Sequence, residues 1–248
     1  MAGARTHDGK RLRGAPIAGI LFDKDGTLID FRATWLAAYR GAAAELCMAA
    51  SLPDDFALTL LARSGYDGQT DSFAETSPLL WATNAAIAEL WLAEPELRGH
   101  AGLAPLVLAH FDDAERYPPV AVGDLADLFR RLKGRGLKLG VATMDSTAKA
   151  EALLLGLDLR ASLDFVTGYD GGFGEKPGPG MVLGFCAATG LAPEEIVVVG
   201  DTAADLQMAR AAGARAAVAV LTGATPRHLL DALADHVLES VMHIENVL

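Results

Sequence analysis

The chain has 248 residues, of which 51% are hydrophobic and 21% are charged, and its formal net charge at pH 7 is −11. This composition provides a sizeable core and excludes wholesale disorder. The acidic balance argues against a non-specific nucleic-acid binder and against a protein held on anionic membranes, so we expect neither partner; an anionic substrate would need a local positive site such as a metal ion.

The first 16 residues contain several basic residues but no apolar segment of a secretory signal, so we expect residues 1–16 to form a flexible tail. The two cysteines, Cys47 and Cys186, lie far apart in apolar surroundings. This spacing favours buried free thiols over a disulfide framework or a zinc site. No apolar run reaches the length of a membrane span. Together these features indicate a cytoplasmic protein.

The first predicted strand lies in residues 17–30, which read IAGILFDKDGTLID. Its apolar run stops at two carboxylates, Asp23 and Asp25, which are followed by Gly26 and Thr27. An ordinary polar turn would explain these residue types. A metal and phosphate site is the alternative, and the rest of the sequence has to decide between them.

Residues 31–118 have a different pattern, with apolar residues at helical spacing and few β-branched runs. The segments SLPDDF and SGYDGQTDSF separate the predicted helices, and a proline pair at 118–119 ends the region. We therefore predict a helical cap domain, inserted after the first strand and well placed to cover a site at its end. Three tryptophans at helical spacing are expected in the core of this cap: Trp35, Trp81 and Trp91.

From residue 119 onward, apolar β-type runs alternate with helical patterns. The predicted strands are 137–143, 163–169, 195–201 and 215–223, and the predicted helices are 123–135, 146–156, 179–190 and 203–212. This alternation predicts an α/β fold with a Rossmann-like parallel sheet flanked by helices. Residues 17–30 and 119–248 together would form this core.

Polar residues follow several of these predicted strands. Asp201 ends the run IVVV, and Thr143 ends GVA. Lys176 lies in the stiff loop GEKPGPG before a helix. Structural explanations exist for some of these: Thr202 could cap a helix with Asp205 in its first turn, and a surface position is the commonest place for a lysine. Neither explains Asp201 after so apolar a strand, and ligands of open parallel sheets bind beyond the carboxyl ends of strands.

If these residues converge, they suit phosphoryl transfer. Two or three carboxylates around one hard cation favour Mg²⁺. Asp23 could then attack phosphorus, and Asp25 could protonate the leaving oxygen and later activate water. Thr143, the backbone N–H of Met144 and Lys176 would bind the phosphoryl oxygens. An extended strand would place Lys24 on the opposite side from Asp23 and Asp25, so we expect no catalytic role for it.

The segments DKDGTL, Thr143 after GVA, Lys176-Pro177 and GDTAAD resemble, in this order, the four motifs of the haloacid dehalogenase superfamily. The resemblance covers nearly the whole chain after residue 16 and is nearest to the phosphoglycolate phosphatase-like branch with a helical cap. It implies that Asp23 is the nucleophile and Asp25 the acid and base. It implies a metal site made of Asp23, the Asp25 carbonyl and Asp201.

By the same resemblance, Asp205 supports the metal site or orients Lys176. Gly26 and Thr27 lie in the turn that leads into the cap, with Gly26 beside the phosphoryl group. Met144 stands where the family often has asparagine, so a side-chain contact is lost while the backbone N–H is kept.

The sequence therefore predicts a Mg²⁺-dependent phosphomonoester hydrolase that acts on a small phosphorylated metabolite through an aspartyl-phosphate, as a monomer or homodimer. Two alternatives remain open at this point. One is a phosphomutase of the β-phosphoglucomutase type. The other is a non-catalytic phosphoryl-binding protein, against which the presence of both Asp23 and Asp25 argues.

Overall fold

A computed structural model describes residues 16–74, 76–80 and 82–248. The predicted tail therefore lies, apart from Pro16, outside the described residues, as does Trp81. The contacts divide the chain into two compact units. We call Phe31–Val120 the inserted unit, and the residues up to Asp30 together with Ala121–Leu248 the core unit. The sequence predicts an inserted domain at residues 31–118, and these limits stay a prediction.

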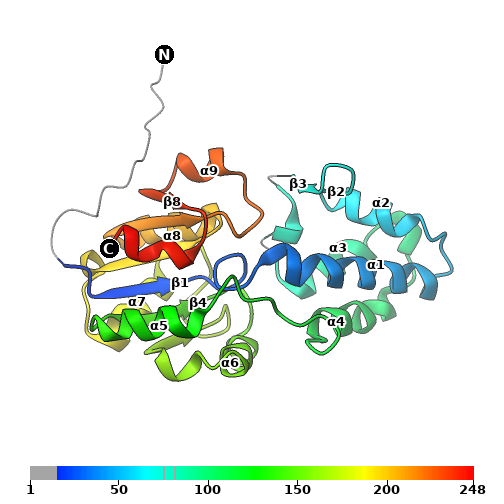
Figure 1. Cartoon of the computed structure of the whole chain (residues 1–248). Coiled ribbons are helices and arrows are strands. Elements are labelled where there is room, and N and C mark those ends of the chain that lie inside the picture. The colour runs from blue at the N-terminus through cyan, green and yellow to red at the C-terminus, as the bar shows by residue number, and fades with distance from the viewer. Residues whose placement is uncertain (1–15, 75, 81) are drawn as a thin grey trace, which may run out of the picture. The chain divides into compact units, whose positions relative to one another are not determined.

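The core unit is built on a parallel sheet of six strands in the order β5-β4-β1-β6-β7-β8 (Figure 1). The strands are β1 Gly19–Phe22, β4 Lys138–Ala142, β5 Phe165–Thr167, β6 Ile196–Gly200, β7 Ala216–Val220 and β8 His236–Leu238. The predicted Rossmann-like sheet is thereby confirmed.

The central strands are almost wholly apolar because helices cover both faces of the sheet. Along β1, Ile20 and Phe22 belong to one buried cluster and Leu21 belongs to the other. The cluster around Ile20 and Phe22 packs against α5 (Leu125–Gly134), α6 (Thr147–Gly156) and the 3₁₀ helix Val241–Asn246. The cluster around Leu21 packs against α7 (Gly180–Thr189), α8 (Ala203–Ala212) and α9 (Arg227–Asp231).

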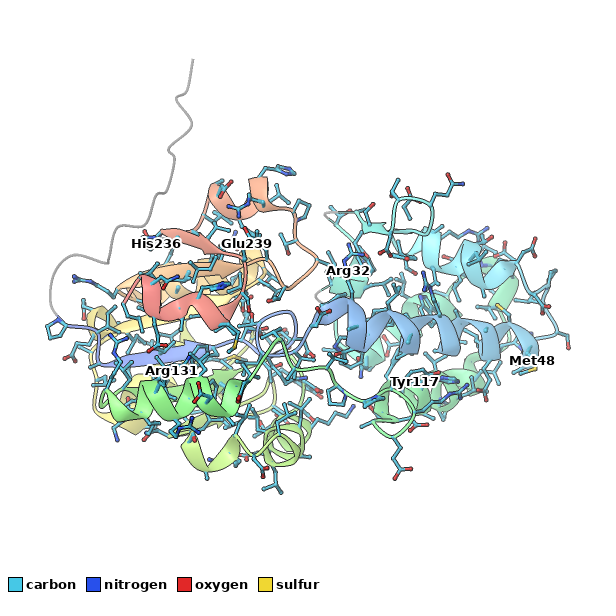
Figure 2. The ribbon with its side chains drawn as sticks, viewed as in Figure 1. Arg32, Met48, Tyr117, Arg131, His236 and Glu239 are labelled. Carbon is cyan, nitrogen blue, oxygen red and sulfur yellow. The ribbon has the colours of Figure 1, made fainter. Side chains whose placement is uncertain are left out.

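On the solvent side of the helices that cover the Ile20 and Phe22 cluster, polar side chains link one helix to another. Figure 2 labels Arg131 on α5. Its guanidinium group donates to Glu245 of the 3₁₀ helix at 2.9 Å. Both residues are partly exposed to solvent, so this pair adds little to stability. The apolar layers are therefore what holds the sheet and its helices together.

The residues at the ends of these helices explain why the helices begin and end where they do. Asp124, Ser146 and Thr202 cap α5, α6 and α8 by accepting a backbone N–H with their side chains. Gly190 and Gly213 end α7 and α8 in the left-handed conformation, which glycine adopts at little cost. These caps fix the ends of the helices next to the loops that carry the predicted site.

The inserted unit is mainly helical. A π-helical turn at Arg32–Leu36 leads into α1 (Ala37–Ala49), and α2 (Phe56–Arg63), α3 (Asn84–Leu92) and α4 (Ala104–Asp112) follow. The segment expected only to separate helices forms a small antiparallel hairpin, β2 (Tyr66–Asp67) and β3 (Ser72–Phe73).

Of the predicted tryptophans that the structure describes, Trp91 lies in the core of the inserted unit, whereas Trp35 is only partly buried, so the core position expected for Trp35 is wrong. Trp91 is fully buried and donates its ring N–H to Ser64 at 2.8 Å. Trp35 stacks on Tyr39 with ring centroids 6.0 Å apart. Both cysteines are free and buried, as predicted. Among the described residues, no helix combines the length and the hydropathy that a membrane span requires.

Candidate active site

The candidate site lies where β1 and β6 end side by side. Phe22 is in register with Val199, and the backbone N–H of Asp23 donates to the carbonyl of Val199 at 2.8 Å. From β1 the sheet order continues to β4 and β5 on one side and to β6, β7 and β8 on the other. Such a switch point leaves a crevice beyond the carboxyl ends of the strands, which is where ligands bind in this architecture.

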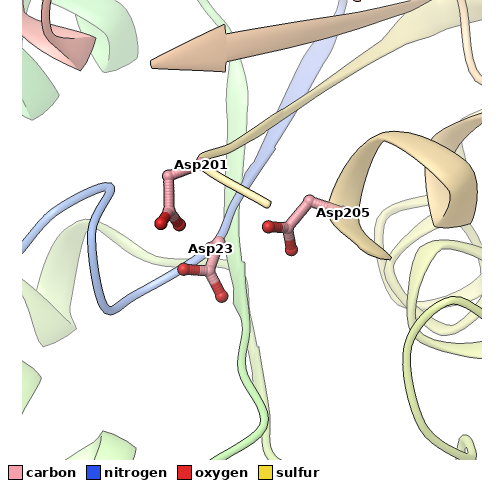
Figure 3. A group of neighbouring side chains, drawn as sticks. All are labelled: Asp23, Asp201 and Asp205. Atoms are coloured by element: carbon pink, nitrogen blue, oxygen red, sulfur yellow. The ribbon is translucent and has the colours of Figure 1, made fainter. Parts of the chain in front are cut away.

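Three carboxylates from two strand ends and one helix meet in this crevice (Figure 3). Oxygen atoms of Asp23, Asp201 and Asp205 all lie within 4.8 Å of one another, and all three residues are buried. Asp23 and Asp201 follow β1 and β6, whereas Asp205 comes from the first turn of α8. The structure thus brings together residues that are far apart in the sequence.

Lys176 enters the same cluster from the loop between β5 and α7. Its ammonium group donates to Asp23, and it donates to Oδ1 of Asp205 at 2.6 Å. The Lys176 side chain is 3% exposed. Burial by itself would lower the pKa of Lys176, but the carboxylates of Asp205 and Asp23 outweigh it and raise this pKa above its ordinary value. Lys176 is therefore a fixed positive charge in the site.

The remaining oxygen of Asp205 belongs to the cap of α8. Oδ2 of Asp205 accepts from the hydroxyl of Thr202 at 2.6 Å and from its backbone N–H at 3.1 Å. Asp205 therefore accepts hydrogen bonds both from the N-cap residue of α8 and from Lys176, and its role in orienting Lys176 stays a prediction. Because both of its oxygens already accept hydrogen bonds, Asp23 and Asp201 are the better placed of the three to bind a cation.

The carboxylates outnumber the positive charge beside them. Burial raises the pKa of Asp23 to about 7, against the lowering effect of Lys176 and with a further rise from Asp205. Burial, followed by the charge of Asp23, also raises the pKa of Asp201 well above its ordinary value. Three carboxylates and one ammonium group carry a net charge of −2 when ionised. A divalent cation would balance this charge, and carboxylate oxygens are the donors that a hard cation such as Mg²⁺ prefers.

Lys24 departs from its expected position. It is 1% exposed, and its ammonium group lies 2.6 Å from Asp25 Oδ2 and 3.3 Å from Asp145 Oδ2. The alternation of side chains along a strand does not extend to Lys24 and Asp25, because β1 ends at Phe22 and the chain then turns. The expectation that Lys24 lies on the opposite side from Asp25 is therefore wrong. Burial would lower the pKa of Lys24, but Asp25 and Asp145 raise it above its ordinary value.

The end of β4 offers hydrogen-bond donors. Thr143 is 1% exposed, and its hydroxyl oxygen accepts from the N–H of Asp145 at 3.1 Å, so its own O–H can still donate. In the described part of the chain, the backbone N–H of Met144 donates to no acceptor. That these two groups bind phosphoryl oxygens stays a prediction.

Gly26 and Thr27 both contact Asp201. Gly26 has φ +81°, and a Cβ added to it would lie 2.3 Å from Oδ2 of Asp201. Its N–H donates to the carbonyl of Ile29 at 2.7 Å, so this hydrogen bond does not support Gly26 as a phosphate donor. The hydroxyl of Thr27 donates to Oδ1 of Asp201 at a long 3.5 Å.

Two further residues of this neighbourhood were not predicted. Thr222, which follows β7, donates its hydroxyl to the carbonyl of Gly26 at 2.7 Å. The next residue, Gly223, comes close to Asp201. The signal that would have found them is the pair Thr-Gly directly after the apolar run at 216–221, the same strand-end position that marked Asp23, Thr143 and Asp201.

Comparison with known proteins places this chain in a family. The family model described as haloacid dehalogenase-like hydrolase matches residues 17–213. The chain belongs to the haloacid dehalogenase-like hydrolase family.

Curated relatives that carry the name of a particular enzyme match a smaller part of the chain. It is 36% identical over 89 residues to phosphoglycolate phosphatase of Escherichia coli (strain K12), which corresponds to 36% of this chain and 35% of that protein. Phosphoglycolate phosphatase of Salmonella choleraesuis (strain SC-B67) matches over the same shares of both chains. The chain thus spans about a third of the length of the curated relatives it matches.

Solved structures with the same fold can be superposed on almost the whole length of this chain. A predicted phosphoglycolate phosphatase of Haemophilus somnus 129PT has a TM-score of 0.69 and 18% identity, with 92% of this chain and 96% of that chain covered. CbbY of Rhodobacter sphaeroides in complex with phosphate has a TM-score of 0.60 and 24% identity, with 90% and 94% covered. At these identities the likeness concerns the fold.

Proposed function

We propose that this protein is a Mg²⁺-dependent phosphomonoesterase that acts on a small phosphorylated metabolite. The observation that carries the proposal is the buried cluster of Asp23, Asp201 and Asp205 around Lys176, which has a net negative charge when ionised. A phosphoryl group and a divalent cation together complete such a cluster electrostatically. The names of the relatives point in the same direction, since phosphoglycolate is a small phosphorylated acid.

In the proposed reaction a carboxylate oxygen of Asp23 attacks phosphorus, and the bond between phosphorus and the leaving oxygen breaks. The proton on Asp25 passes to that oxygen, so the product leaves as an alcohol. A water molecule then attacks the phosphorus of the aspartyl-phosphate and loses its proton to Asp25. Cleavage of the acyl-phosphate bond releases inorganic phosphate and restores both carboxyl groups.

Asp23 and Asp201 would hold Mg²⁺, which would supply positive charge that keeps Asp23 ionised and reduces its repulsion from the phosphoryl group. The proposal includes the backbone carbonyl of Asp25 as a further oxygen ligand.

The phosphoryl oxygens would be bound by groups that are already in place. An ammonium group has three donors, and Lys176 uses two of them for Asp23 and Asp205. Its third donor, the hydroxyl of Thr143 and the N–H of Met144 are proposed to hold the transferred group. Asp205 then acts by holding Lys176 in position. Thr27 and Gly26 are proposed to support Asp201.

The part of the substrate beyond its phosphoryl group is less constrained. Arg63 pairs with Glu94 and Glu96 on the surface of the inserted unit. Arg32 pairs with Asp71 of the same unit. Both arginines already form ion pairs within the inserted unit, so neither is assigned to the substrate. We propose 2-phosphoglycolate as the first substrate to test, because the relatives are phosphoglycolate phosphatases. A monomeric or homodimeric state and a cytoplasmic location stay predictions.

The test is hydrolysis of p-nitrophenyl phosphate by the purified protein with Mg²⁺, which should be lost on addition of EDTA. Asp23→Asn should abolish turnover while the circular dichroism spectrum stays unchanged, because the amide is a poor nucleophile. Asp158→Asn is the matched control, since Asp158 is exposed on the surface. Substantial metal-dependent hydrolysis by Asp23→Asn would contradict the assigned nucleophile.

A panel of metabolites should then include 2-phosphoglycolate, sugar phosphates and nucleoside monophosphates. The same panel, run with and without a sugar bisphosphate, separates hydrolysis from phosphomutase activity. A phosphomutase would need the bisphosphate and would release little inorganic phosphate.

A further inference from the structure

The carboxylate of Asp201 lies between two glycines from different loops. At Gly223, a Cβ would lie 1.9 Å from Oδ2 of Asp201, 2.4 Å from Cγ and 2.6 Å from Cβ. At Gly26, the corresponding distances are 2.3 Å to Oδ2, 2.5 Å to Cγ and 2.8 Å to Oδ1. The three nearest atoms to each of these positions all belong to Asp201. Real Cβ atoms do not come this close, so only glycine fits at either position while Asp201 keeps its place.

The two loops that carry these glycines are tied to each other. Thr222 donates its hydroxyl to the carbonyl of Gly26 at 2.7 Å. Thr222 and Gly223 follow β7, the strand that pairs with β6, and Asp201 follows β6 itself. Loops from three strand ends therefore meet around one carboxylate.

Asp201 and Asp205 are held in different ways. Asp205 accepts short hydrogen bonds from Lys176 and Thr202, at 2.6 Å each. The hydrogen bond that Asp201 accepts from Thr27 is 3.5 Å long and weak at that distance. The position of the Asp201 carboxylate therefore depends on the surfaces on either side of it.

We propose that Thr222 and Gly223 are positioning residues for Asp201 in the binding of a divalent cation. Gly223 provides the surface against which the carboxylate rests, and Thr222 fixes the spacing of the two loops through its hydrogen bond to the carbonyl of Gly26. This inference rests on the proposed function to the extent that Asp201 binds the cation. It adds the loop after β7 to the loops after β1, β4, β5 and β6 that the sequence motifs identify.

Gly223 permits a clean test. Its φ lies outside the left-handed region, so alanine is compatible with its backbone, and the three atoms nearest to the added Cβ all belong to Asp201. Gly134 in α5 is the matched control, because a Cβ there would have no neighbour within 4 Å and its φ is also outside that region. Gly26 is less suitable, since its φ of +81° would strain any other residue.

The experiment measures the Mg²⁺ dissociation constant by isothermal titration calorimetry, without substrate, for the wild type, Gly223→Ala and Gly134→Ala. We expect Gly223→Ala to bind Mg²⁺ about 10- to 100-fold more weakly, the range for residues that orient a ligand. Gly134→Ala should bind like the wild type. Equal dissociation constants for folded Gly223→Ala and the wild type would overturn the proposal.

A second pair of variants decides the matter if Gly223→Ala does not fold. Thr222→Val removes the hydroxyl at nearly constant volume and should weaken Mg²⁺ binding, whereas Thr222→Ser keeps the hydroxyl and should restore it. Equal binding by the Val and Ser variants would count against the proposal. A role in general packing would not give this rescue by serine.

The outcome also separates this inference from the proposed function. A wild type that binds Mg²⁺ but hydrolyses no phosphomonoester contradicts the function, while the comparison of variants still decides the inference. A wild type that hydrolyses its substrate with Mg²⁺, and whose Gly223→Ala variant binds the ion equally well, contradicts the inference alone. A folded wild type that binds no Mg²⁺ contradicts both.

Discussion

The raised pKa of Asp23 predicts that this residue destabilises the metal-free protein above neutral pH. A carboxyl group whose pKa is 3.8 when unfolded and about 7 when folded binds its proton more tightly in the folded state. The stability that it contributes is present below pH 4 and is lost as the pH rises through 7. The perturbation is Asp23→Asn, which replaces the carboxyl group by an amide that cannot ionise.

The magnitude follows from the two pKa values. A rise from 3.8 to about 7 corresponds to a loss of about 4 kcal/mol once Asp23 is fully ionised. Roughly 2 to 3 kcal/mol of this loss falls between pH 5 and pH 8, since part of it has occurred by pH 5. Asp23 is only 8% exposed, so solvent screens the effect little. The attraction of Lys176 is already contained in the raised pKa and does not have to be subtracted again.

The assay is urea unfolding in EDTA at pH 5 and pH 8, followed by circular dichroism. Asp23→Asn should be more stable than the wild type at pH 8, and its advantage should shrink by roughly 2 to 3 kcal/mol at pH 5. Asp158→Asn, an exposed control, should show no such change with pH. Added Mg²⁺ should stabilise the wild type and have less effect on Asp23→Asn, because a ligand that binds only the folded state stabilises it.

Two outcomes would refute this reasoning. One is an Asp23→Asn variant that is less stable than the wild type at pH 8. The other is a difference in stability that is the same at both pH values. Either would mean that the carboxylate cluster is not short of positive charge in the folded protein.

Two further predictions concern polar groups around the site. Lys24→Met should lower the free energy of unfolding by about 1 to 3 kcal/mol, which is below the usual range for a broken buried ion pair. The loss is smaller because the side chains of Asp25 and Asp145 are 24% and 19% exposed, so water can solvate them once Lys24 is gone. A loss under about 0.5 kcal/mol in urea unfolding would contradict the importance of these ion pairs. Thr202→Ala should cost about 1 kcal/mol by removing the cap of α8, and Thr202→Ser should recover most of it; equal midpoints for the two variants would show that the cap hydroxyl does not contribute.

The parts of the fold that the sequence predicted are those where local signals and burial agree. The run at 195–201 contains β6, whose five residues are all buried, because a strand covered on both faces has to be apolar throughout. The helix predicted at 203–212 has the bounds of α8, since Thr202 caps it and Gly213 ends it. In contrast, β8 and α9 were not predicted. Strand β8 has three partly buried residues and begins with a histidine, so it has no apolar run to mark it.

In the candidate site, too, some residues could be predicted from the sequence and others could not. The residue types at the strand ends were visible in the sequence, since Asp23, Thr143 and Asp201 each follow an apolar run. Lys24 was assigned to the wrong side because the period of two was continued past the end of β1. Gly223 was missed because it was counted within the predicted strand 215–223, whereas β7 ends at Val220 and Gly223 lies beyond the strand end, close to Asp201.

The charge balance of the site links its stability to its proposed chemistry. A nucleophilic carboxylate has to be ionised, yet burial holds the pKa of Asp23 near 7, so in the metal-free protein a large part of Asp23 is protonated at neutral pH. Lys176 alone does not offset this, because it is shared with Asp205. Binding of a divalent cation would lower the pKa of Asp23 and remove the cost of ionising it in one step. The same deficit of positive charge that would destabilise the metal-free fold would therefore make the proposed nucleophile depend on the cation for its ionisation.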